Sequence, residues 1–526
     1  MSKDEGSFQP VEPPLDSGMG TEVSGGSGVS VPSTADTRRL AIRGSIWTLG
    51  GYGVSQAFRL VSNVVLSALL APELFGVMTL VTVFMSGLNM FSDIGIGPSL
   101  IQNPRGEEPD FRNTAWTIST LRGIGLWVVT CVLAWPFAKF YDEPILLQVL
   151  PVAGLSAVIN GLNSTALVLL NRRIELGRLT FLDFAAQIIS LLVMCVWAWF
   201  DRSAWALVAG NLSACLCRLA YSFMLIPGHR DSFRWDSRSA QALLKFGRWV
   251  FFSTLITFMA TQSDRLMLGK LESTADLGVY GVAVALTLLA KEVVLRLAST
   301  IQFPALARHI NDDPGSLRRT LHQSREPLLV LALASTLGIG LGATTFFQLL
   351  YDSRYQDAAW ITLWLAPSVW FSLLQGTSDR ALLAMGHSRD LAMSNLVRAI
   401  VTVACCLLGY AIAGHFFPQE PHFQMMGFIT GLTLGTASGH AYVAWRLFGY
   451  GVPITRADVG YSGLFFALLI VPALVGHQFA GVHLFDLMFR GHERHVDLAW
   501  VAVAAVVMIP IGLWALLRLR RVLLAR

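Results

Sequence analysis

Nine basic side chains lie inside long apolar segments of the chain: Arg59, Arg122, Arg218, Arg248, Arg265, Lys291, Arg296, Arg380 and Arg398. Five acids do the same: Asp93, Asp183, Asp264, Glu292 and Asp379. A charge at the centre of a bilayer costs roughly 2.5 to 3.5 kcal/mol on insertion scales, so such groups usually face a partner or a water-filled cavity. The excess of basic groups predicts that a cavity between these segments would attract an anion.

Arg59 and Arg265 are the first choices for binding that anion. Each lies in the first apolar segment of its half of the chain, roughly two thirds of the way toward the outer end, so the two can converge. The supporting residues are Arg122, Arg218 and Lys291. Glu292 and Arg296, four positions apart on a helix, share a face and can neutralise each other, which leaves Lys291 the freer charge.

Each of these charges also has a structural explanation. For five residues near the ends of their segments, snorkelling to the membrane interface is the preferred interpretation: Arg248, Asp183, Asp379, Arg380 and Arg398. Asp264 and Arg265 point about 100° apart on a helix, so they are a poor pair. Asp264 and Arg265 therefore each either form a structural bridge to another helix or bind the substrate or an ion. A cross-helix acid such as Asp93 can claim Arg122 or Arg218.

Membrane carboxylates are rare, and three of them are candidates for coupling to an ion gradient: Asp93, Asp264 and Asp379. No loop of the form GxxxxGK followed by Ser or Thr occurs, so the chain by itself is not an ATP-driven pump. His492 and His495 resemble a zinc-protease motif, but they are three rather than four positions apart, which favours a solvated loop. No metal and no cofactor are therefore predicted.

The elements that must position these residues are membrane-spanning helices. Of 526 residues, 54% are apolar and 14% are charged, against roughly 25% charged in soluble domains. Segments near the roughly 20 residues that a helix needs to cross the hydrocarbon lie at 41–70, 74–101, 113–138, 146–170, 180–200, 203–226, 241–270, 277–307, 326–350, 358–386, 391–414, 424–448, 458–480 and 497–518. These fourteen segments predict an all-α polytopic membrane protein.

The composition also divides the chain into parts. Residues 1–37, rich in Gly, Ser, Pro and acids, predict a disordered cytoplasmic tail. Two six-helix lobes are predicted at 38–228 and 229–450, and residues 451–526 add two helices and a basic carboxy terminus. All six cysteines lie within apolar segments, so no disulfide framework is expected.

The Lys and Arg residues outside the spans orient this map. One side of the membrane holds 24 of them, whereas the other holds Lys139, Arg202, Lys270, Arg354, Arg490 and Arg494. The positive-inside rule places the richer side, and with it both termini, in the cytoplasm.

The two halves of the chain begin alike. In the first half, an apolar segment passes Arg59 and turns at ELFGV, residues 73–77, into a second apolar segment. In the second half, the segment passes Asp264 and Arg265 and turns at DLGV, residues 276–279. Repeated halves in a membrane protein indicate a transporter whose site lies where the repeats meet.

Four stretches carry a family resemblance: LLAPELFGVMTL from Leu69, FSDIGIGPSLIQ from Phe91, TQSDRLMLGKL from Thr261 and LGVYGVAVAL from Leu277. Over residues 38–450 the chain resembles the polysaccharide transporter branch of the multidrug/oligosaccharidyl-lipid/polysaccharide exporter superfamily. It is most similar to the Wzx-like lipid-linked oligosaccharide flippases. Residues 174–177 depart from the family pattern, which has an aromatic residue there in many relatives.

The resemblance implies a V-shaped pair of six-helix lobes that alternates between inward-open and outward-open states. The implied substrate is an undecaprenyl-diphosphate-linked oligosaccharide, moved from the inner to the outer leaflet of the bacterial cytoplasmic membrane for exopolysaccharide or O-antigen synthesis. No bond is made or broken, so a transporter and not an enzyme is expected. The expected partners are membrane lipids, and the polysaccharide polymerase and export machinery are further candidates. No nucleic acid partner is expected.

Two other function classes stay open. A cation-coupled drug antiporter of the same superfamily predicts a cavity dominated by acids and aromatic residues, which the basic excess argues against. A membrane polysaccharide polymerase or ligase predicts a large outer loop with catalytic Arg and His, and only the short region from His477 to His495 offers such residues.

Overall fold

The computed structural model describes residues 34–93, 95–172, 176–224, 231–308 and 314–480, and these residues form helices without any strand. The chain divides into two units, Met1–Arg43 and Gly44–Arg526, and the site described below lies wholly within the second. Most of the predicted tail, the last predicted span and the histidines near 492 lie outside the described residues.

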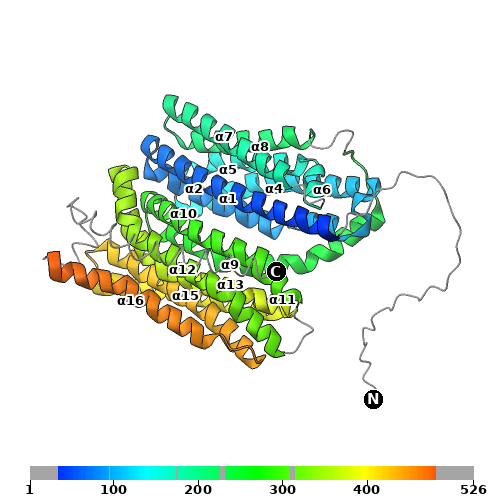
Figure 1. Cartoon of the computed structure of the whole chain (residues 1–526). Helices are drawn as coiled ribbons and strands as arrows, with labels where there is room; N and C mark the ends of the chain where they lie inside the picture. The colour runs from blue at the N-terminus through cyan, green and yellow to red at the C-terminus, as the bar shows by residue number, and fades with distance from the viewer. Residues whose placement is uncertain (1–33, 94, 173–175, 225–230, 309–313, 481–526) are drawn as a thin grey trace, which may run out of the picture. The chain divides into compact units, whose positions relative to one another are not determined.

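The helices follow one another along the chain with short connections (Figure 1). The first half contains α1 (Thr34–Leu69), α2 (Pro72–Phe91), α3 (Ile96–Gln102), η1 (Pro104–Glu107), α4 (Pro109–Tyr141), α5 (Leu146–Leu162), α6 (Ala166–Arg172), α7 (Leu176–Phe200) and α8 (Ala204–Ser222). The second half contains α9 (Ser237–Leu271), α10 (Thr274–Leu297), η2 (Ala298–Gln302), α11 (Phe303–Arg308), α12 (Pro314–Leu350), η3 (Ser353–Tyr355), α13 (Ala358–Ala384), α14 (Ser388–Phe416), α15 (Pro421–Gly449) and α16 (Thr455–Ala480). Every predicted span that falls in the described part lies on one to three of these helices.

Two of the predicted spans are interrupted. The span at 74–101 breaks between α2 and α3, where Gly95 adopts a left-handed φ of 68° and its N–H donates to the Asp93 carboxylate at 2.9 Å. The span at 146–170 breaks between α5 and α6, where the N–H of Ser164 donates to the hydroxyl of Ser222 at 3.0 Å instead of continuing a helix. Side chains compete for backbone groups at both breaks, which apolar length alone does not reveal.

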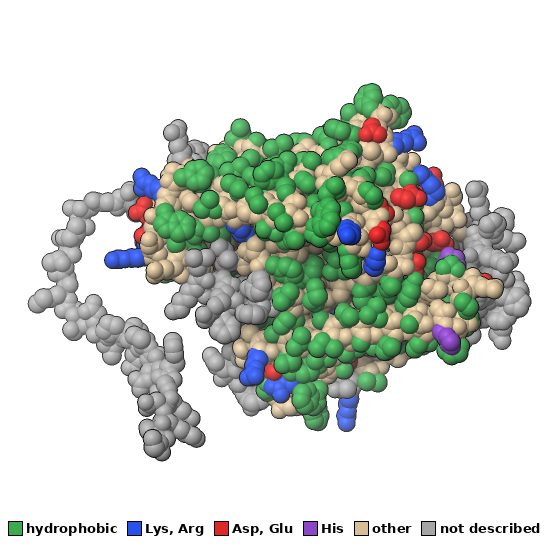
Figure 2. Space-filling model, turned by 180° about the vertical axis from the view of Figure 1, so that it is seen from behind, with side chains coloured by type: hydrophobic (Ala, Val, Ile, Leu, Met, Phe, Trp, Pro, Cys, Tyr) green, Lys and Arg blue, Asp and Glu red, His purple; other side chains and the backbone are tan. Residues whose placement is uncertain are grey.

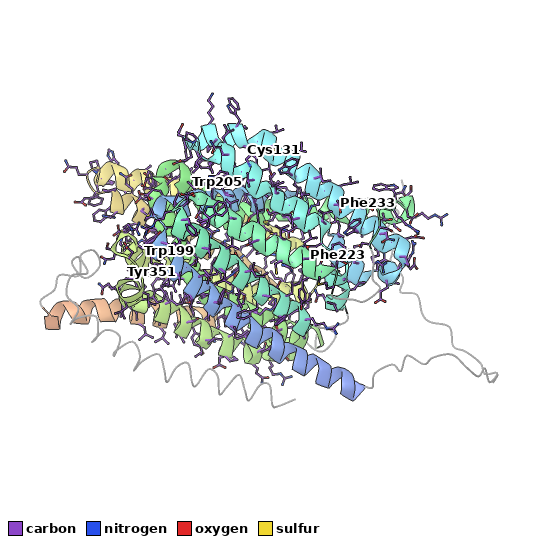
Figure 3. All side chains as sticks on the ribbon, turned by 90° about the horizontal axis from the view of Figure 1, so that it is seen from above. Cys131, Trp199, Trp205, Phe223, Phe233 and Tyr351 are labelled. Atoms are coloured by element: carbon purple, nitrogen blue, oxygen red, sulfur yellow. The ribbon has the colours of Figure 1, made fainter. Side chains whose placement is uncertain are left out.

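The surface of the described residues is that of a membrane protein. Eight of the described helices are long and apolar enough to cross a bilayer. Apolar side chains cover the middle of the molecule, and charged side chains gather toward its ends (Figure 2). Exposed aromatic residues mark those ends, with Trp199 at one and Phe233 at the other (Figure 3). The prediction of an all-α polytopic membrane protein is confirmed, and the count of fourteen spans stays a prediction.

The two halves meet where α2 packs against α10. A Cβ atom on Gly76 would lie 1.8 Å from the carbonyl oxygen of Thr274, and one on Gly278 would lie 1.9 Å from that of Pro72. No side chain fits at such distances, so both positions require glycine. The two glycines occupy matching places in the ELFGV and DLGV turns, and they let the amino-terminal ends of α2 and α10 touch through their backbones.

The segment that joins α8 to α9 is fastened to the first half by Asp231. Its carboxylate accepts hydrogen bonds from the hydroxyls of Ser164 at 2.7 Å and Thr165 at 2.6 Å. Arg112 of α4 places its Nε 3.7 Å from the same carboxylate, whose side chain is fully buried. A buried charge with this many partners holds the segment in place.

Beyond Asp231, the segment runs along the start of α4. The N–H groups of Arg234 and Asp236 donate to the hydroxyls of Thr117 and Thr114 at 3.1 and 3.0 Å. Asp236 also caps α9, because its carboxylate accepts the N–H of Ser239 at 2.9 Å. Hydrogen bonds from Ser239 lower the pKa of the Asp236 carboxyl below its usual value. A single residue therefore ties α4 to the first turn of α9.

Helix α16, which corresponds to the first of the two predicted carboxy-terminal helices, is held by a buried ion pair. Arg325 of α12 donates to Asp458 of α16 at 2.6 Å, and the two side chains are 4% and 5% exposed. Arg325 also donates to the Thr377 hydroxyl at 3.1 Å and to the Leu374 carbonyl at 3.2 Å. His440 Nε2 of α15 lies 3.2 Å from the second Asp458 oxygen. This cluster joins α12, α13, α15 and α16.

Candidate functional site: a polar pocket between the two halves

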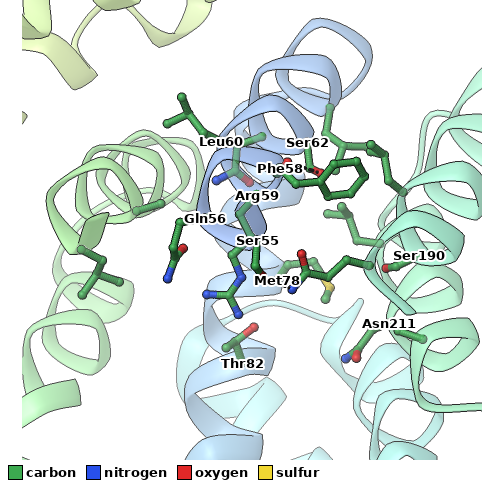
Figure 4. A pocket seen from close by; sticks show the side chains of 18 of the residues that line it. Ser55, Gln56, Phe58, Arg59, Leu60, Ser62, Met78, Thr82, Ser190 and Asn211 are labelled. Atoms are coloured by element: carbon green, nitrogen blue, oxygen red, sulfur yellow. Dashed lines mark hydrogen bonds between the residues drawn. The ribbon is translucent and has the colours of Figure 1, made fainter. Parts of the chain in front are cut away.

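A pocket of about 1120 Å³ lies between the first-half helices and α10 (Figure 4). Its lining comes from α1, α2, α5, α7 and α8 on one side and from α10, with Arg265 of α9, on the other. Four arginines and two acids are among the lining residues: Arg59, Arg218, Arg265, Arg296, Asp183 and Glu292. The formal charge of this lining is therefore positive by two.

Arg59 and Arg265 enter the same pocket from the first long helix of each half. Arg59 is exposed to the pocket, and Arg265 is half-buried and donates to the Gln262 side chain at 2.5 Å. Neither arginine forms an ion pair with an acid in the part of the chain that the structure describes. The two guanidinium groups are thus available to a ligand, and the structure brings together the pair that the sequence placed first.

Arg218 also lines the pocket, but it has a partner. Its Nη1 lies 3.4 Å from the carboxylate of Asp183 on α7, and both side chains are close to half exposed. The partner of Arg218 is therefore Asp183 and not Asp93, which sequence reasoning had considered. The pair leaves this side of the pocket without net charge.

The face of helix α10 that lines the pocket differs from the one that we expected, because it does not include Lys291. Glu292 and Arg296 line it, together with apolar residues one and two turns earlier, whereas Lys291 does not. Adjacent residues on a helix point about 100° apart, and here Glu292 is the one of the two that faces the cavity. Gln56 of α1 donates a hydrogen bond to Glu292. Lys291 instead interacts electrostatically with buried groups of the second half, which include Asp264.

Arg122 lies outside the pocket lining. Its Nε donates to the Ser92 hydroxyl and its Nη2 to the Asn89 carbonyl oxygen, both at 2.9 Å. Asp93 is the acid that acts on it electrostatically. These contacts join α4 to the end of α2, beside the break between α2 and α3.

The three acids considered for ion coupling also lie outside the lining. Asp93 accepts the N–H of Gly95, and Asp264 accepts the hydroxyl of Tyr280 at 2.7 Å in a buried position. One oxygen of Asp379 is buried and has no hydrogen-bond partner among the described residues. Their role in coupling stays a prediction.

Sequence reasoning missed the amide side chains of the pocket: Gln56, Asn63, Asn160, Gln187 and Asn211. Amides inside apolar segments are visible in the sequence and carry a desolvation penalty of their own. They were not singled out because an uncharged group is cheaper to bury than a charge. They become candidates for a binding site because the structure brings all five to one pocket.

Comparison with known proteins identifies the family. A family model described as polysaccharide biosynthesis protein matches residues 65–360, which is more than half of the chain. The chain belongs to this family. The superfamily resemblance drawn from the sequence is thereby confirmed for the polysaccharide branch.

Curated proteins that match this chain are distant relatives. The chain is 20% identical over 325 residues to the lipopolysaccharide biosynthesis protein WzxC of Escherichia coli (strain K12), which covers 61% of this chain and 65% of WzxC. It is 21% identical over 385 residues to the succinoglycan biosynthesis transport protein ExoT of Rhizobium meliloti (strain 1021), which covers 73% of this chain and 75% of ExoT. The chain thus spans a little less than two thirds of WzxC.

Solved structures establish the fold of this family member. The lipid II flippase MurJ in an inward closed conformation superposes with a TM-score of 0.64 at 14% identity, over 90% of this chain and 100% of MurJ. An inward-facing multidrug transporter of the MATE family superposes with a TM-score of 0.58 at 12% identity, over 78% of this chain and 98% of that one. Both are transporters, and the predicted fold class agrees with them.

Proposed function

We propose that this chain is a flippase that moves an undecaprenyl-diphosphate-linked oligosaccharide from the inner to the outer leaflet of a bacterial cytoplasmic membrane. The observation that carries the proposal is the meeting of Arg59 and Arg265, from matching helices of the two halves, in one positively charged pocket. A diphosphate pays heavily to leave water, and guanidinium groups can replace its hydration with bidentate hydrogen bonds. Family membership supports a polysaccharide precursor as the cargo.

The proposal assigns the diphosphate to Arg59 and Arg265. Arg218 is paired with Asp183, and Arg122 donates to α2, so both have structural partners. Lys291 lies next to the pocket-lining residue Glu292 without lining the pocket itself. Alternating access would open this pocket to each leaflet in turn, with the lipid tail left in the membrane between the halves.

A cation-coupled drug antiporter of the same superfamily is the main alternative. It would need a pocket that attracts cations, through unpaired acids and aromatic faces. Here the acids Asp183 and Glu292 both have partners, to Arg218 and Gln56, and arginines outnumber acids. Phe58 and Phe75 are the aromatic lining residues in the described part of the chain. These observations favour an anionic cargo.

The test is a flipping assay in proteoliposomes. An undecaprenyl-diphosphate disaccharide with a fluorophore on the sugar is placed in both leaflets, and a membrane-impermeant reductant reports its arrival outside. We expect Arg59→Gln and Arg265→Gln to slow flipping about 10- to 100-fold, because each removes a charge-assisted contact of about 1.5 to 3 kcal/mol.

The matched control is Arg319→Gln. Arg319 is an exposed arginine of α12 that donates to the Gly315 carbonyl and does not line the pocket. This variant should flip the lipid at the wild-type rate. A wild-type protein that flips no faster than empty liposomes, or pocket variants that match the control, would contradict the proposal.

A further inference from the structure

One wall of the pocket is polar but carries no net charge. It is formed by Asn160 of α5, Gln187 and Ser190 of α7, and Asn211 of α8. Ser190 and Asn211 lie across the pocket from Arg59 of α1 (Figure 4). The charged residues on the same wall, Asp183 and Arg218, neutralise each other at 3.4 Å. We call these four uncharged residues the amide wall.

Two amides of this wall, Asn160 and Asn211, form only long hydrogen bonds with other protein groups. Asn160 donates to the sulfur of Cys215 at 3.8 Å, and the Cys215 thiol in turn points to the Asn211 oxygen at 3.8 Å. A thiol is a weak donor and a weak acceptor. The Asn163 amide reaches the Asn160 oxygen only at 3.4 Å. Most of the hydrogen-bonding groups of Asn160 and Asn211 therefore have no strong partner in the part of the protein that the structure describes.

Gln187 is held in a fixed orientation with one atom left over. Its nitrogen donates to the hydroxyl of Ser55 on α1 at 2.5 Å, which joins the amide wall to the helix that carries Arg59. Its oxygen is buried and has no hydrogen-bond partner within the described ranges. Buried polar atoms nearly always have a partner, so this oxygen still needs a donor that the described protein groups do not supply.

We propose that the amide wall is the subsite for the sugar, and that the sugars it accepts are uncharged. Sugar hydroxyls both donate and accept, as carboxamides do, so the two sets of groups match. A carboxylate on the sugar would face Asp183 and lose its hydration with no unpaired cation on this wall to replace it. The inference rests on the proposed function, because the diphosphate is what brings the sugar into the pocket.

The charge of the pocket agrees with this division. A diphosphate that is esterified at both ends keeps roughly one negative charge per phosphorus. The lining has a formal excess of two positive charges. The lipid diphosphate alone therefore balances the pocket, and an acidic sugar would exceed that balance.

Binding of three lipids to the full-length protein in detergent tests the subsite. The first is undecaprenyl diphosphate, the second carries a glucose–galactose disaccharide, and the third replaces the galactose with glucuronic acid. We expect the neutral disaccharide to lower the Kd about tenfold relative to the bare lipid, and the acidic one to lower it less.

Two near-isosteric variants locate the gain. Asn211→Leu and Gln187→Met should abolish most of the tenfold gain and leave the Kd of the bare lipid within about twofold of wild type. Asn395→Leu is the control, because Asn395 is an amide of the membrane helix α14 that does not line the pocket. Thermal unfolding of each variant separates loss of the subsite from loss of the fold.

The outcomes distinguish this inference from the proposed function. If the bare lipid does not bind wild-type protein, the proposed function fails and the sugar subsite falls with it. If the bare lipid binds through Arg59 but the disaccharide adds nothing, or Asn211→Leu keeps the gain, the subsite alone is overturned. Tighter binding of the glucuronic acid lipid than of the neutral one overturns the preference for uncharged sugars.

Discussion

Arginine plays different roles in this membrane protein, and the partner of each side chain decides which. Arg325 is buried, and each of its nitrogens donates to a group on α13 or α16. Arg59 has no ion pair among the described residues and faces the pocket. The first arrangement stabilises a fold, because the charge is desolvated once and stays matched. The second leaves a charge without a fixed counter-charge among the residues described, and the proposed function assigns that charge to the diphosphate.

The buried pair gives a prediction about stability. Arg325→Met leaves Asp458 buried and short of its main partner, and we expect it to lower the free energy of unfolding by about 3 to 5 kcal/mol. The double variant Arg325→Met with Asp458→Leu should recover most of that loss. Arg354→Met, which breaks the exposed pair with Asp352, should cost only about 0 to 1 kcal/mol. Thermal unfolding in detergent measures all three, and equal losses for Arg325→Met and Arg354→Met would contradict this account.

At the scale of elements, the contact between α2 and α10 and the fastened segment before α9 limit how the halves can move. The contact joins backbone to backbone through Gly76 and Gly278. The segment ties α4 to the first turn of α9 through Asp236. If the halves rock against each other during transport, the glycine contact must separate while Asp236 serves as the fixed point.

The glycine contact is testable by adding one methyl group. Gly278→Ala places a Cβ 1.9 Å from the Pro72 carbonyl oxygen, so α2 and α10 must move apart. We expect a loss of about 1 to 3 kcal/mol of stability, together with slower flipping. Gly125→Ala is the control, because apart from the backbone of its own helix and its two chain neighbours no atom lies within 4 Å of its added Cβ. That variant should be neutral, or up to about 1 kcal/mol more stable. A Gly278→Ala protein as stable and active as this control would mean that the contact is dispensable.

At the scale of the whole molecule, function depends on how the chain is oriented in the membrane. Under the proposed function, the pocket must open to the inner leaflet at one stage of the transport cycle. The distribution of Lys and Arg predicts that the connection between α13 and α14 is cytoplasmic, and that the one between α14 and α15 is outside.

Cysteine labelling tests this orientation. Ser388 and Gln419 are both exposed and lie at opposite ends of α14 or just beyond it. A membrane-impermeant maleimide should label Gln419→Cys in intact spheroplasts and Ser388→Cys only after permeabilisation. Wild-type protein supplies the background from its six native cysteines, which lie in apolar segments. The reverse pattern would place the termini outside.

The amino-acid sequence by itself determined the helices, the repeated hairpins and the positions at which charges enter the membrane. These features are local, because apolar length and the spacing of ionisable residues can be read along the chain without knowing which helices touch. The ELFGV and DLGV turns also identified the matching glycines, although not the contact between them.

Only the tertiary structure decided which of these charges share a pocket. Arg59 and Arg265 meet there, whereas Lys291 is turned away and Arg218 is matched by Asp183. The tertiary structure likewise brings the amides of α5, α7 and α8 together in this pocket. The direction of a side chain depends on the rotation of its helix, and helix rotation is set by packing against neighbours that are distant in the sequence.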